Sequence, residues 1–419
     1  MEKFGQYILL DRVACGGMAE LFKAKKIGIE GFERVLAIKR ILPHISSDEE
    51  FISMFIAEAK LAAHLSHKNI AQIYDFGKTG EDYFIAMEYI KGKDLRALFK
   101  RCQEKNVVLP GELAVFIARE ILSALGYAHK QKDGSGRDLK LIHRDVSPQN
   151  ILISYEGEVK VIDFGIAKAE TQSHTKTGTI KGKLAYMSPE QAWGNPIDHR
   201  SDIFSLGIVI YEMITGNRLF KGTTEIKTLE MVREAKAEPF SPSLVAVIPS
   251  ELESIVIKAL SKDVKSRYQD ASDMERYLGS VLFELSSAAP GTILKKLMND
   301  MFRDEIEAEN RTSAEDATKS IKYESKVVQI PKESKESKPQ VRPETKPEPA
   351  KKSFSYVLLG ASLIFFLVAV FLMWPYITGE KTASSLIPAQ VYNMAKQKIP
   401  VQETTVQQTP LSQEQVAPP

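Results

Sequence analysis

The sequence predicts an α+β fold with two lobes, a smaller one rich in strands followed by a larger one rich in helices. Before Leu95 the chain consists mainly of short runs in which apolar and polar residues alternate, whereas helical apolar spacing dominates after it. Strands followed by helices are typical of an α+β arrangement. A long uncharged segment near the C-terminus predicts one transmembrane helix in addition.

The first lobe is expected to contain five strands and one helix. The helix is predicted over 48–65, because Phe51, Phe55 and Ala59 recur at helical spacing. The strands are expected at 7–13, 20–26, 35–40, 70–77 and 82–88. Helices of the second lobe are expected at 112–129, 201–215, 225–235 and 252–260, with an extra helix over 284–301.

Composition excludes several classes of protein. The 419 residues carry a net charge of only +2, so no overall field attracts nucleic acid. The two cysteines, Cys15 and Cys102, provide neither a disulfide framework nor a zinc-binding pattern. The N-terminus lacks the apolar core of a signal peptide, so the first lobe is expected in a reducing compartment.

The C-terminal third predicts a membrane anchor. Residues 302–352 are rich in Lys, Glu and Pro, which predicts a disordered cytoplasmic linker. The uncharged stretch that follows predicts a transmembrane helix over 354–377, long enough to cross a lipid bilayer once; a buried core helix is the alternative. Lys and Arg are concentrated upstream, which places the N-terminal part in the cytoplasm and 378–419 outside the cell membrane as a short tail.

A set of short motifs carries the chemistry. His143-Arg144-Asp145 is followed by Asn150 and then by Asp163-Phe164-Gly165. With Lys39, Glu58 and Ser188-Pro189-Glu190 in the same order, this set resembles the eukaryotic-type Ser/Thr protein kinase family, and the membrane layout resembles its bacterial receptor-like members. The resemblance covers residues 5–283 and implies the bilobal protein kinase fold.

The resemblance implies a role for each matching residue. Asp145 would accept the proton of the attacking hydroxyl, and Asn150 and Asp163 would bind Mg²⁺, with Mn²⁺ as an alternative. Lys39 would hold the α- and β-phosphates of ATP, aimed by Glu58. Structural roles are implied for Glu190, which would pair with Arg267, and for Asp202, which would cap the catalytic loop.

The implied nucleotide site combines a glycine-rich loop with the segment that joins the lobes. The loop departs from the family pattern, because alanine replaces two of the three glycines, although Gly16-Gly17 still lets backbone N–H groups approach phosphate. Asp94 resembles the family's ribose contact, with a helix N-cap as the alternative. The expected contacts are Val13, Ala14, Cys15, Gly16, Gly17, Met18, Ala19, Leu21, Ala37, Lys39, Met87, Glu88, Tyr89 and Asp94.

A second departure concerns the catalytic cation. The family's Ser/Thr members usually carry Lys two residues after the catalytic Asp and Gly-Thr before the Ser-Pro-Glu motif, whereas this chain has Ser147 and Gly182-Lys183. The lysine and the hydroxyl have exchanged places, so we expect Lys183 to provide the ammonium at the γ-phosphate and Ser147 the hydroxyl. The alternative is that Lys183 is a solvated loop residue.

The sequence also predicts how the activity is regulated and leaves its type open. Arg144 suggests control by phosphorylation of Thr175, Thr177 or Thr179 in the segment after Gly165. The resemblance implies protein substrates and no nucleic-acid partner; a homodimer would allow each copy to phosphorylate the other. Three alternatives to a Ser/Thr kinase stay open, namely a nucleotide-binding pseudokinase, a small-molecule phosphotransferase and a tyrosine kinase.

Overall fold

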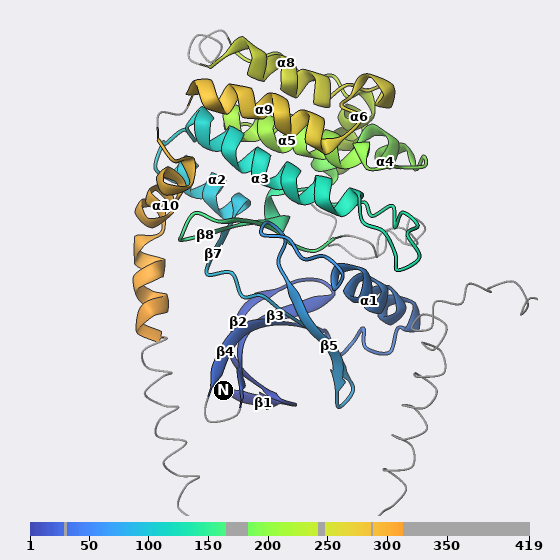
Figure 1. The fold of residues 1–419 in the computed structure, drawn as a ribbon, viewed down its shortest axis with the longest axis vertical. Coiled ribbons are helices and arrows are strands. Elements are labelled where there is room, and N and C mark those ends of the chain that lie inside the picture. The colour runs from blue at the N-terminus through green and yellow to red at the C-terminus, as the bar shows by residue number, and fades with distance from the viewer. Residues whose placement is uncertain (29–31, 165–182, 242–247, 286–287, 313–419) are drawn as a thin grey trace, which may run out of the picture. The chain divides into compact units, whose positions relative to one another are not determined.

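A computed structural model describes residues 1–28, 32–164, 183–241, 248–285 and 288–312, all within the first of two compact units, Met1–Ile330. A β-rich lobe is followed by a helical lobe, as the sequence predicts (Figure 1). The catalytic motifs lie where the two lobes meet. The predicted transmembrane helix, 354–377, and the tail, 378–419, lie outside the described residues.

The first lobe is an antiparallel sheet with one helix packed on it. The sheet has the strand order β1-β2-β3-β4-β6-β5. The helix, α1 (Glu49–Ala62), begins at Asp48, whose side chain accepts a hydrogen bond from the Phe51 N–H. Its apolar face buries Phe55 and Ala59 against Ile41 and Ile85 of the sheet, which fixes the helix above the cleft. The strands are β1 (Glu2–Phe4), β2 (Tyr7–Cys15), β3 (Ala19–Ile27), β4 (Glu33–Ile41), β5 (Ile73–Thr79) and β6 (Asp82–Met87).

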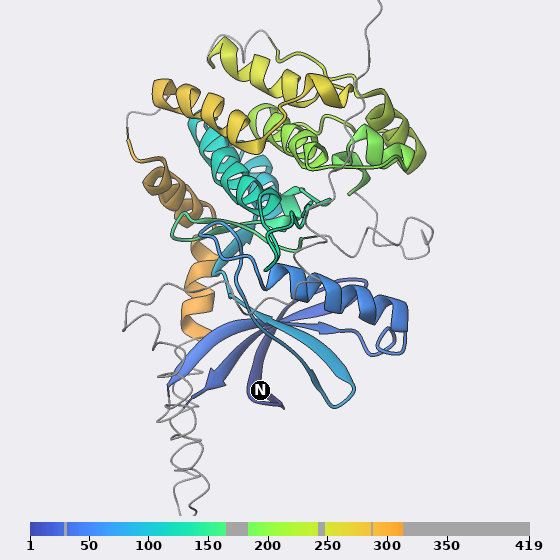
Figure 2. The same ribbon diagram turned by 45° about the vertical axis from the view of Figure 1, so that its right-hand side comes forward.

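The second lobe is built around two buried helices. In α3 (Gly111–His129) and α5 (Arg200–Thr215), apolar residues occur nearly all round the helix, which is typical of a core position. A small sheet of β7 (Gly92–Asp94), β8 (Ile151–Ser154) and β9 (Val159–Val161) faces the cleft. The other helices surround this core: α2 (Leu95–Glu104), α4 (Pro189–Trp193), α6 (Glu225–Glu234), α8 (Ser250–Ala259), α9 (Ala271–Leu285) and α10 (Pro290–Met301) (Figure 2).

Two predicted boundaries are wrong. The strand expected over 70–77 begins only at Ile73, because Ile70 pairs with Val161 of β9 and the Ala71 N–H donates to the Val161 carbonyl. The linker expected over 302–352 begins inside a helix, since residues 303–312 are helical and Ile306 packs against the core of the second lobe. Residues 313–352 lie outside the described ranges.

Two further differences concern the ends of the chain's elements. The predicted helix over 284–301 corresponds to the end of α9, residues 286–287, which the structure does not describe, and α10. The strand that carries Lys39 is β4 rather than the third strand, because the short β1 precedes it. Within the described ranges, we find no helix that is both long and apolar enough to cross a membrane.

Candidate active site

Lys39 contacts two carboxylates, Glu58 in its own lobe and Asp163 at the second lobe. It lies on β4, which pairs with β3 and β6, so its backbone is fixed by neighbours on both sides. Its Nζ is 3.4 Å from Glu58 Oε1 on α1 and 2.8 Å from Asp163 Oδ1. Burial lowers the pKa of Lys39, but the charges of Asp163 and Glu58 outweigh burial and raise the pKa above its ordinary value. Lys39 is therefore charged at neutral pH.

The pKa of Asp163 is held below its ordinary value. Desolvation between the lobes opposes ionisation even though 38% of the side chain is exposed, but the ion pair with Lys39 and the charge of Lys183 outweigh it. The backbone of Asp163 has a φ of 53°, which is unfavourable for a non-glycine residue. Such strain is concentrated at functional sites.

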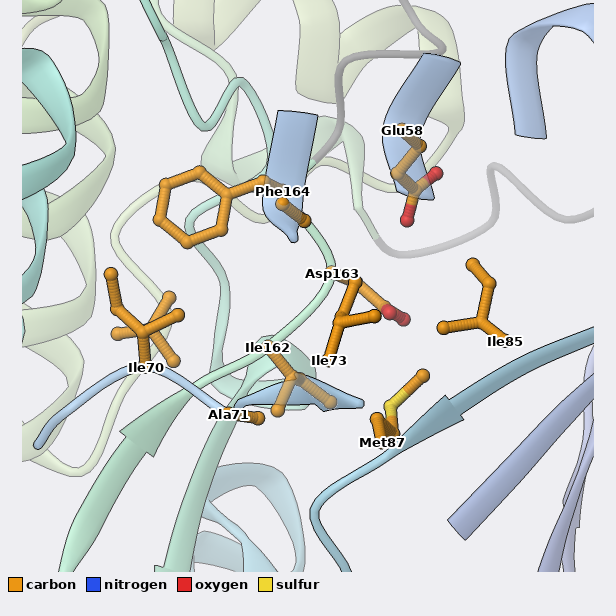
Figure 3. Close-up of a pocket in the computed structure, with 11 residues that line it drawn as sticks. Glu58, Ile70, Ala71, Ile73, Ile85, Met87, Ile162, Asp163 and Phe164 are labelled. Atoms are coloured by element: carbon orange, nitrogen blue, oxygen red, sulfur yellow. The ribbon is translucent and has the colours of Figure 1, made fainter. Parts of the chain in front are cut away.

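A mostly apolar pocket is lined by Glu58 and Asp163, the two carboxylates that contact Lys39 (Figure 3). Besides Glu58 of α1 and Asp163, Met87 at the end of β6 lines this pocket. Met87 pairs with the buried Ala37 of β4, so these two predicted nucleotide contacts are neighbours on the sheet. Apolar walls with a few polar groups are what a small-molecule site requires.

Asp202 supports the catalytic loop through hydrogen bonds to its backbone, as predicted. Asp202 is 1% exposed in the first turn of α5, and its carboxylate accepts from the backbone N–H groups of His143 and Arg144, both at 2.8 Å. Burial opposes its ionisation, but the hydrogen bond and charge of His129 keep the pKa of Asp202 low. The two N–H bonds hold Arg144 at a φ of 64°, so Asp202 stabilises a strained loop.

Asp145 is positioned by contacts with Asn150 and Lys183 among others. The Asn150 side-chain amide donates to the Asp145 carbonyl at 2.8 Å and to its Oδ2 at 2.9 Å. Lys183 Nζ lies 2.8 Å from the same Oδ2. The carboxylate that would act as base is therefore fixed by an amide and by a cation.

Lys183 and Ser147, which were predicted to exchange the roles of cation and hydroxyl, lie in different environments. Lys183 lies beside Asp145, with 28% of its side chain exposed. Ser147 is fully buried, and its Oγ has no hydrogen-bond partner among the described residues. The role of the Ser147 hydroxyl at the γ-phosphate therefore stays a prediction, and in this conformation that hydroxyl is buried.

The other predicted nucleotide contacts form two groups. The glycine-rich loop connects β2 and β3, and the Gly16 N–H donates to the Ala19 carbonyl within the turn. Its predicted residues from Val13 to Met18 are exposed, and Ala19 and Leu21 are half-buried. The carboxylate of Glu88 pairs with Lys160, with Oε1 2.8 Å from the ammonium.

Asp94 and Tyr89 occupy the connection between the lobes. Asp94 Oδ1 accepts from the Ala97 N–H at 2.7 Å as the N-cap of α2, which is the structural alternative that the sequence left open. Burial raises the pKa of Asp94. The ring of Tyr89 is half-buried beneath Lys23, whose Nζ is 5.6 Å from the ring centre.

Asn150 and Asp163 fit a magnesium ion by their chemistry. Mg²⁺ is typically bound by one or two protein oxygen donors together with water and phosphate oxygens. The Asn150 amide nitrogen is used by Asp145, which leaves its oxygen as the donor for a cation. No cluster of three or more His, Cys, Asp or Glu suited to a metal occurs in the described part of the chain, so a fully protein-built metal site is not found there.

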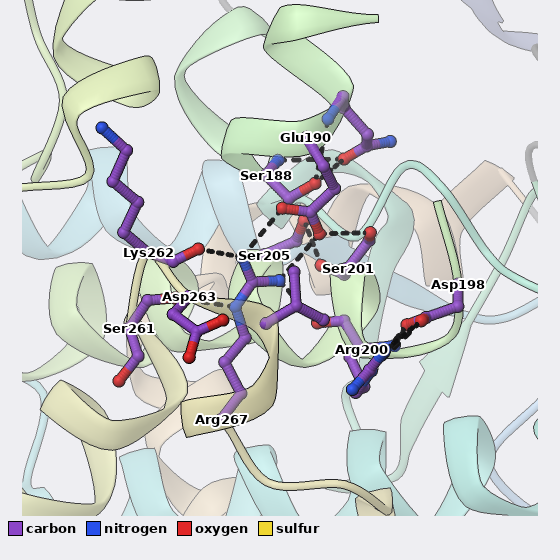
Figure 4. Close-up of polar contacts among 12 residues, drawn as sticks. Ser188, Glu190, Asp198, Arg200, Ser201, Ser205, Ser261, Lys262, Asp263 and Arg267 are labelled. Carbon is purple, nitrogen blue, oxygen red and sulfur yellow. Dashed lines mark hydrogen bonds and ion pairs between the residues drawn. The ribbon is translucent and has the colours of Figure 1, made fainter. Parts of the chain in front are cut away.

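A buried ion pair anchors the segment after Lys183, as the sequence predicts (Figure 4). Arg267 Nη1 and Nη2 donate to the two oxygens of Glu190 at 2.7 and 2.8 Å. Ser188 caps α4 through a capping box with Gln191, whose side-chain amide also donates to the Arg144 carbonyl at 3.0 Å. The anchor is thereby connected to the catalytic loop.

Two groups of contacts in the site are not indicated by any sequence motif. The Arg96 guanidinium, the Tyr186 hydroxyl and the Glu212 carboxylate form a mutually hydrogen-bonded group between α2, the turn η6 (Leu184–Tyr186) and α5. His143 lies against the backbone of Ile162, with Nε2 3.0 Å from its carbonyl. Sequence reasoning missed both, although Tyr186, in an apolar stretch just before Ser-Pro-Glu, was a signal for the first.

Arg144 lies at the edge of the site with its guanidinium half-buried. No acidic side chain among the described residues is within ion-pair distance of it. Burial lowers its pKa, and the charge of Asp202 offsets this in part. Thr175, Thr177 and Thr179, which were expected to regulate through Arg144, lie outside the described residues.

The geometry agrees with a comparison to known families. A profile described as the protein kinase domain matches residues 7–277. The chain belongs to the eukaryotic-type Ser/Thr protein kinase family. This kinase domain covers most of the described residues, so α10 and the helical residues 303–312 lie after the matched region.

The kinase domain resembles several bacterial proteins. It is 38% identical to the tyrosine-protein kinase MasK of Myxococcus xanthus over 306 residues, 73% of this chain and 47% of MasK. It is 37% identical to the serine/threonine-protein kinase PrkC of Bacillus subtilis over 65% of this chain and 40% of PrkC. The chain therefore matches less than half the length of these two relatives. The solved kinase domain of Mycobacterium tuberculosis PknI covers 67% of this chain and 96% of its own, with 23% identity and a TM-score of 0.49.

Proposed function

We propose that this chain is an ATP-dependent protein kinase that phosphorylates Ser and Thr hydroxyls of cytosolic proteins and of itself. One observation carries the proposal: Lys39 bridges Glu58 and Asp163 in the cleft where Asn150 holds Asp145. These five side chains are the parts that phosphoryl transfer requires. Their assembly argues against a nucleotide-binding scaffold, and the Glu190 anchor after Asp163 argues against a small-molecule phosphotransferase.

These residues would together catalyse one displacement reaction at the γ-phosphorus of ATP. The substrate hydroxyl oxygen forms a bond to the γ-phosphorus while the bond from that phosphorus to the β,γ-bridging oxygen breaks, so that ADP leaves. Asp145 takes the hydroxyl proton, and Asn150 keeps its carboxylate oriented towards that proton. Lys39 holds the α- and β-phosphates, and Asn150 and Asp163 would hold Mg²⁺, which supplies neutralising charge when bound.

The kinase is proposed to be a single-pass protein of the cell membrane, with its kinase domain in the cytoplasm. The uncharged segment 354–377 and the excess of Lys and Arg before it support this arrangement. A membrane anchor also raises the local concentration of copies, which favours phosphorylation of one copy by another. Protease digestion of intact and opened cells that carry an epitope at each end tests the orientation.

Phosphorylation of Thr175, Thr177 or Thr179 is proposed to activate the enzyme through Arg144. Arg144 lines a small pocket together with Asp145 and, among the described residues, its guanidinium lacks an acidic partner, so a phosphate can pair with it. Mass spectrometry of the active full-length protein tests this. Full activity with all three threonines unmodified would refute the switch.

Tyrosine specificity is the second candidate function. MasK is named a tyrosine-protein kinase, and Ser147 stands where Ser/Thr members of the family usually have Lys. PrkC, named a serine/threonine-protein kinase, is similar at nearly the same identity.

Phosphoamino-acid analysis decides between these activities. The full-length chain, purified in detergent, is incubated with Mg²⁺ and ATP labelled in its γ-phosphate, beside Asp145→Asn. We expect labelled phosphoserine or phosphothreonine from the wild type and none from the variant. Phosphotyrosine alone would overturn the Ser/Thr assignment, and nucleotide binding without any protein label would favour the scaffold.

A further inference from the structure

We propose that Lys183 supplies the cation that binds the transferring γ-phosphate, from a position outside the catalytic loop. The inference deepens the proposed kinase function and rests on it. Between His143 and Asn150 the chain has no lysine, and the Ser147 side chain is buried. A lysine at the γ-phosphate would therefore come from another segment, and a cation there is favourable because phosphoryl transfer concentrates negative charge on the γ-phosphate oxygens.

The position of the Lys183 ammonium suits this task. Its Nζ lies 2.8 Å from Asp145 Oδ2, the oxygen that also accepts from Asn150. A base within hydrogen-bond reach of the attacking hydroxyl is about 3 Å from it, and that hydroxyl is about 3 Å from the phosphorus that it attacks. An ammonium in contact with Asp145 therefore lies within reach of the γ-phosphate.

The donors of the ammonium allow a second contact. A lysine ammonium has three donors, and among the described residues only Asp145 is found to take one. Lys183 also lines a small pocket beside the base, together with Arg144, Asp145, Val146, Tyr186 and Met187. The Lys183 ammonium thus contacts Asp145 and also borders a pocket from which a phosphate could approach.

The backbone of Lys183 is held by the well-packed turn that follows it. The Lys183 carbonyl accepts from the Tyr186 N–H at 3.0 Å at the start of η6, in which all three residues are buried. The Tyr186 hydroxyl is bonded to Glu212 of α5 and to Arg96 of α2. Lys183 is therefore attached to the helical core of the second lobe.

The test compares two nucleotides that differ only in the γ-group. Wild type and Lys183→Met are titrated in the full-length protein with ADP and with an ATP analogue whose β,γ-bridge is nitrogen, so that no transfer occurs. We expect Lys183→Met to weaken binding of the analogue about 10-fold or more and to leave ADP binding unchanged. Unchanged ADP affinity also shows that the variant is folded.

Turnover provides the second readout. Removal of one charged donor at a transition state typically lowers kcat by about 10² to 10³-fold, and we expect that loss in Lys183→Met with partial rescue in Lys183→Arg. Lys181→Met is the matched control and should keep the wild-type kcat. If Lys183 only fixes Asp145, turnover falls while the ratio of analogue to ADP affinity stays at the wild-type value, and the proposal is overturned.

Failure of the inference differs from failure of the proposed function. An inactive wild type would refute the kinase assignment itself. An active wild type whose Lys183→Met variant binds the analogue normally, or turns over at the wild-type rate, would refute only the role of Lys183.

Discussion

Arg267 and Glu190 form a two-bond ion pair that joins the start of α4 to the turn before α9. Both bonds are short, 2.7 and 2.8 Å, and the Arg267 side chain is fully buried. The Ser201 hydroxyl donates to the same Glu190 at 2.6 Å, and the Ser261 carbonyl accepts from Arg267 at 2.8 Å. The pair therefore fixes the end of the segment that carries Lys183 against the helical core.

Arg267→Met should strongly destabilise the kinase domain. Removal of one partner leaves the Glu190 carboxylate buried without its cation, which typically costs about 3–5 kcal/mol. We expect a much lower urea midpoint for the variant than for the wild type. Lys78→Met is the matched control, because Lys78 pairs with Glu81 on the surface, and it should leave the midpoint nearly unchanged. Equal losses in the two variants would contradict the prediction.

The same pair predicts a loss of stability in acid. Burial raises the pKa of Glu190, but hydrogen bonds from Arg267 and Ser201 outweigh burial and lower the pKa below its ordinary value of 4.5. A lowered folded-state pKa contributes stability above the unfolded pKa that disappears as the pH falls through the folded pKa. The difference in unfolding free energy between wild type and Glu190→Gln should therefore be constant near neutral pH and shrink below about pH 4.5. A constant difference into strong acid would show that Glu190 is not the titrating group.

Asp202→Asn should reduce turnover more than nucleotide binding. The carboxylate accepts from the N–H groups of His143 and Arg144, and an amide replaces one acceptor oxygen by a donor. The strained Arg144 backbone then loses support, and misplacement of Asp145 by about 1 Å can cost 10²-fold in kcat. Lys39 lies in the other lobe, so affinity for ADP should change little. Wild-type kcat in this variant would refute the role of Asp202.

Sequence reasoning predicted the contacts that belong to ordered motifs. The pairs of Lys39 with Glu58 and of Glu190 with Arg267, and the capping by Asp202, are all present. Residue spacing determined which elements would carry these side chains, and the fold then brought them together.

Contacts that depend on the packed structure were not predicted. The segment 303–312 is highly charged, so its composition indicates a solvated linker. Contacts with Arg101, Lys91 and Tyr155, together with the packing of Ile306, hold it on the second lobe. Ser147 was expected at the cleft from its place in the motif, but the turn of η2 (Pro148–Asn150) leaves its hydroxyl buried. Side-chain direction at such a turn is not encoded in residue spacing.

The helix over 303–312 should open more readily when its polar contacts are removed. Arg101 of α2 pairs with Glu305, and Lys91, in the connection between the lobes, donates to Asn310 at 2.6 Å. The Arg101 and Glu305 side chains are about a quarter to a third exposed, so solvent screening limits their contribution to at most about 1 kcal/mol. Arg101→Ala should therefore speed hydrogen exchange in 303–312 up to about five-fold, because local opening depends on the free energy of these contacts.

The matched control for Arg101→Ala is a neighbouring residue of α2. Lys100 also belongs to α2 but pairs with Glu104 within that helix, so Lys100→Ala should leave exchange in 303–312 at the wild-type rate. Exchange in the buried α5 should be unchanged in both variants, because neither substitution lowers the global stability much. Equal exchange of 303–312 in Arg101→Ala and wild type would show that the Arg101–Glu305 pair does not hold this helix on the second lobe.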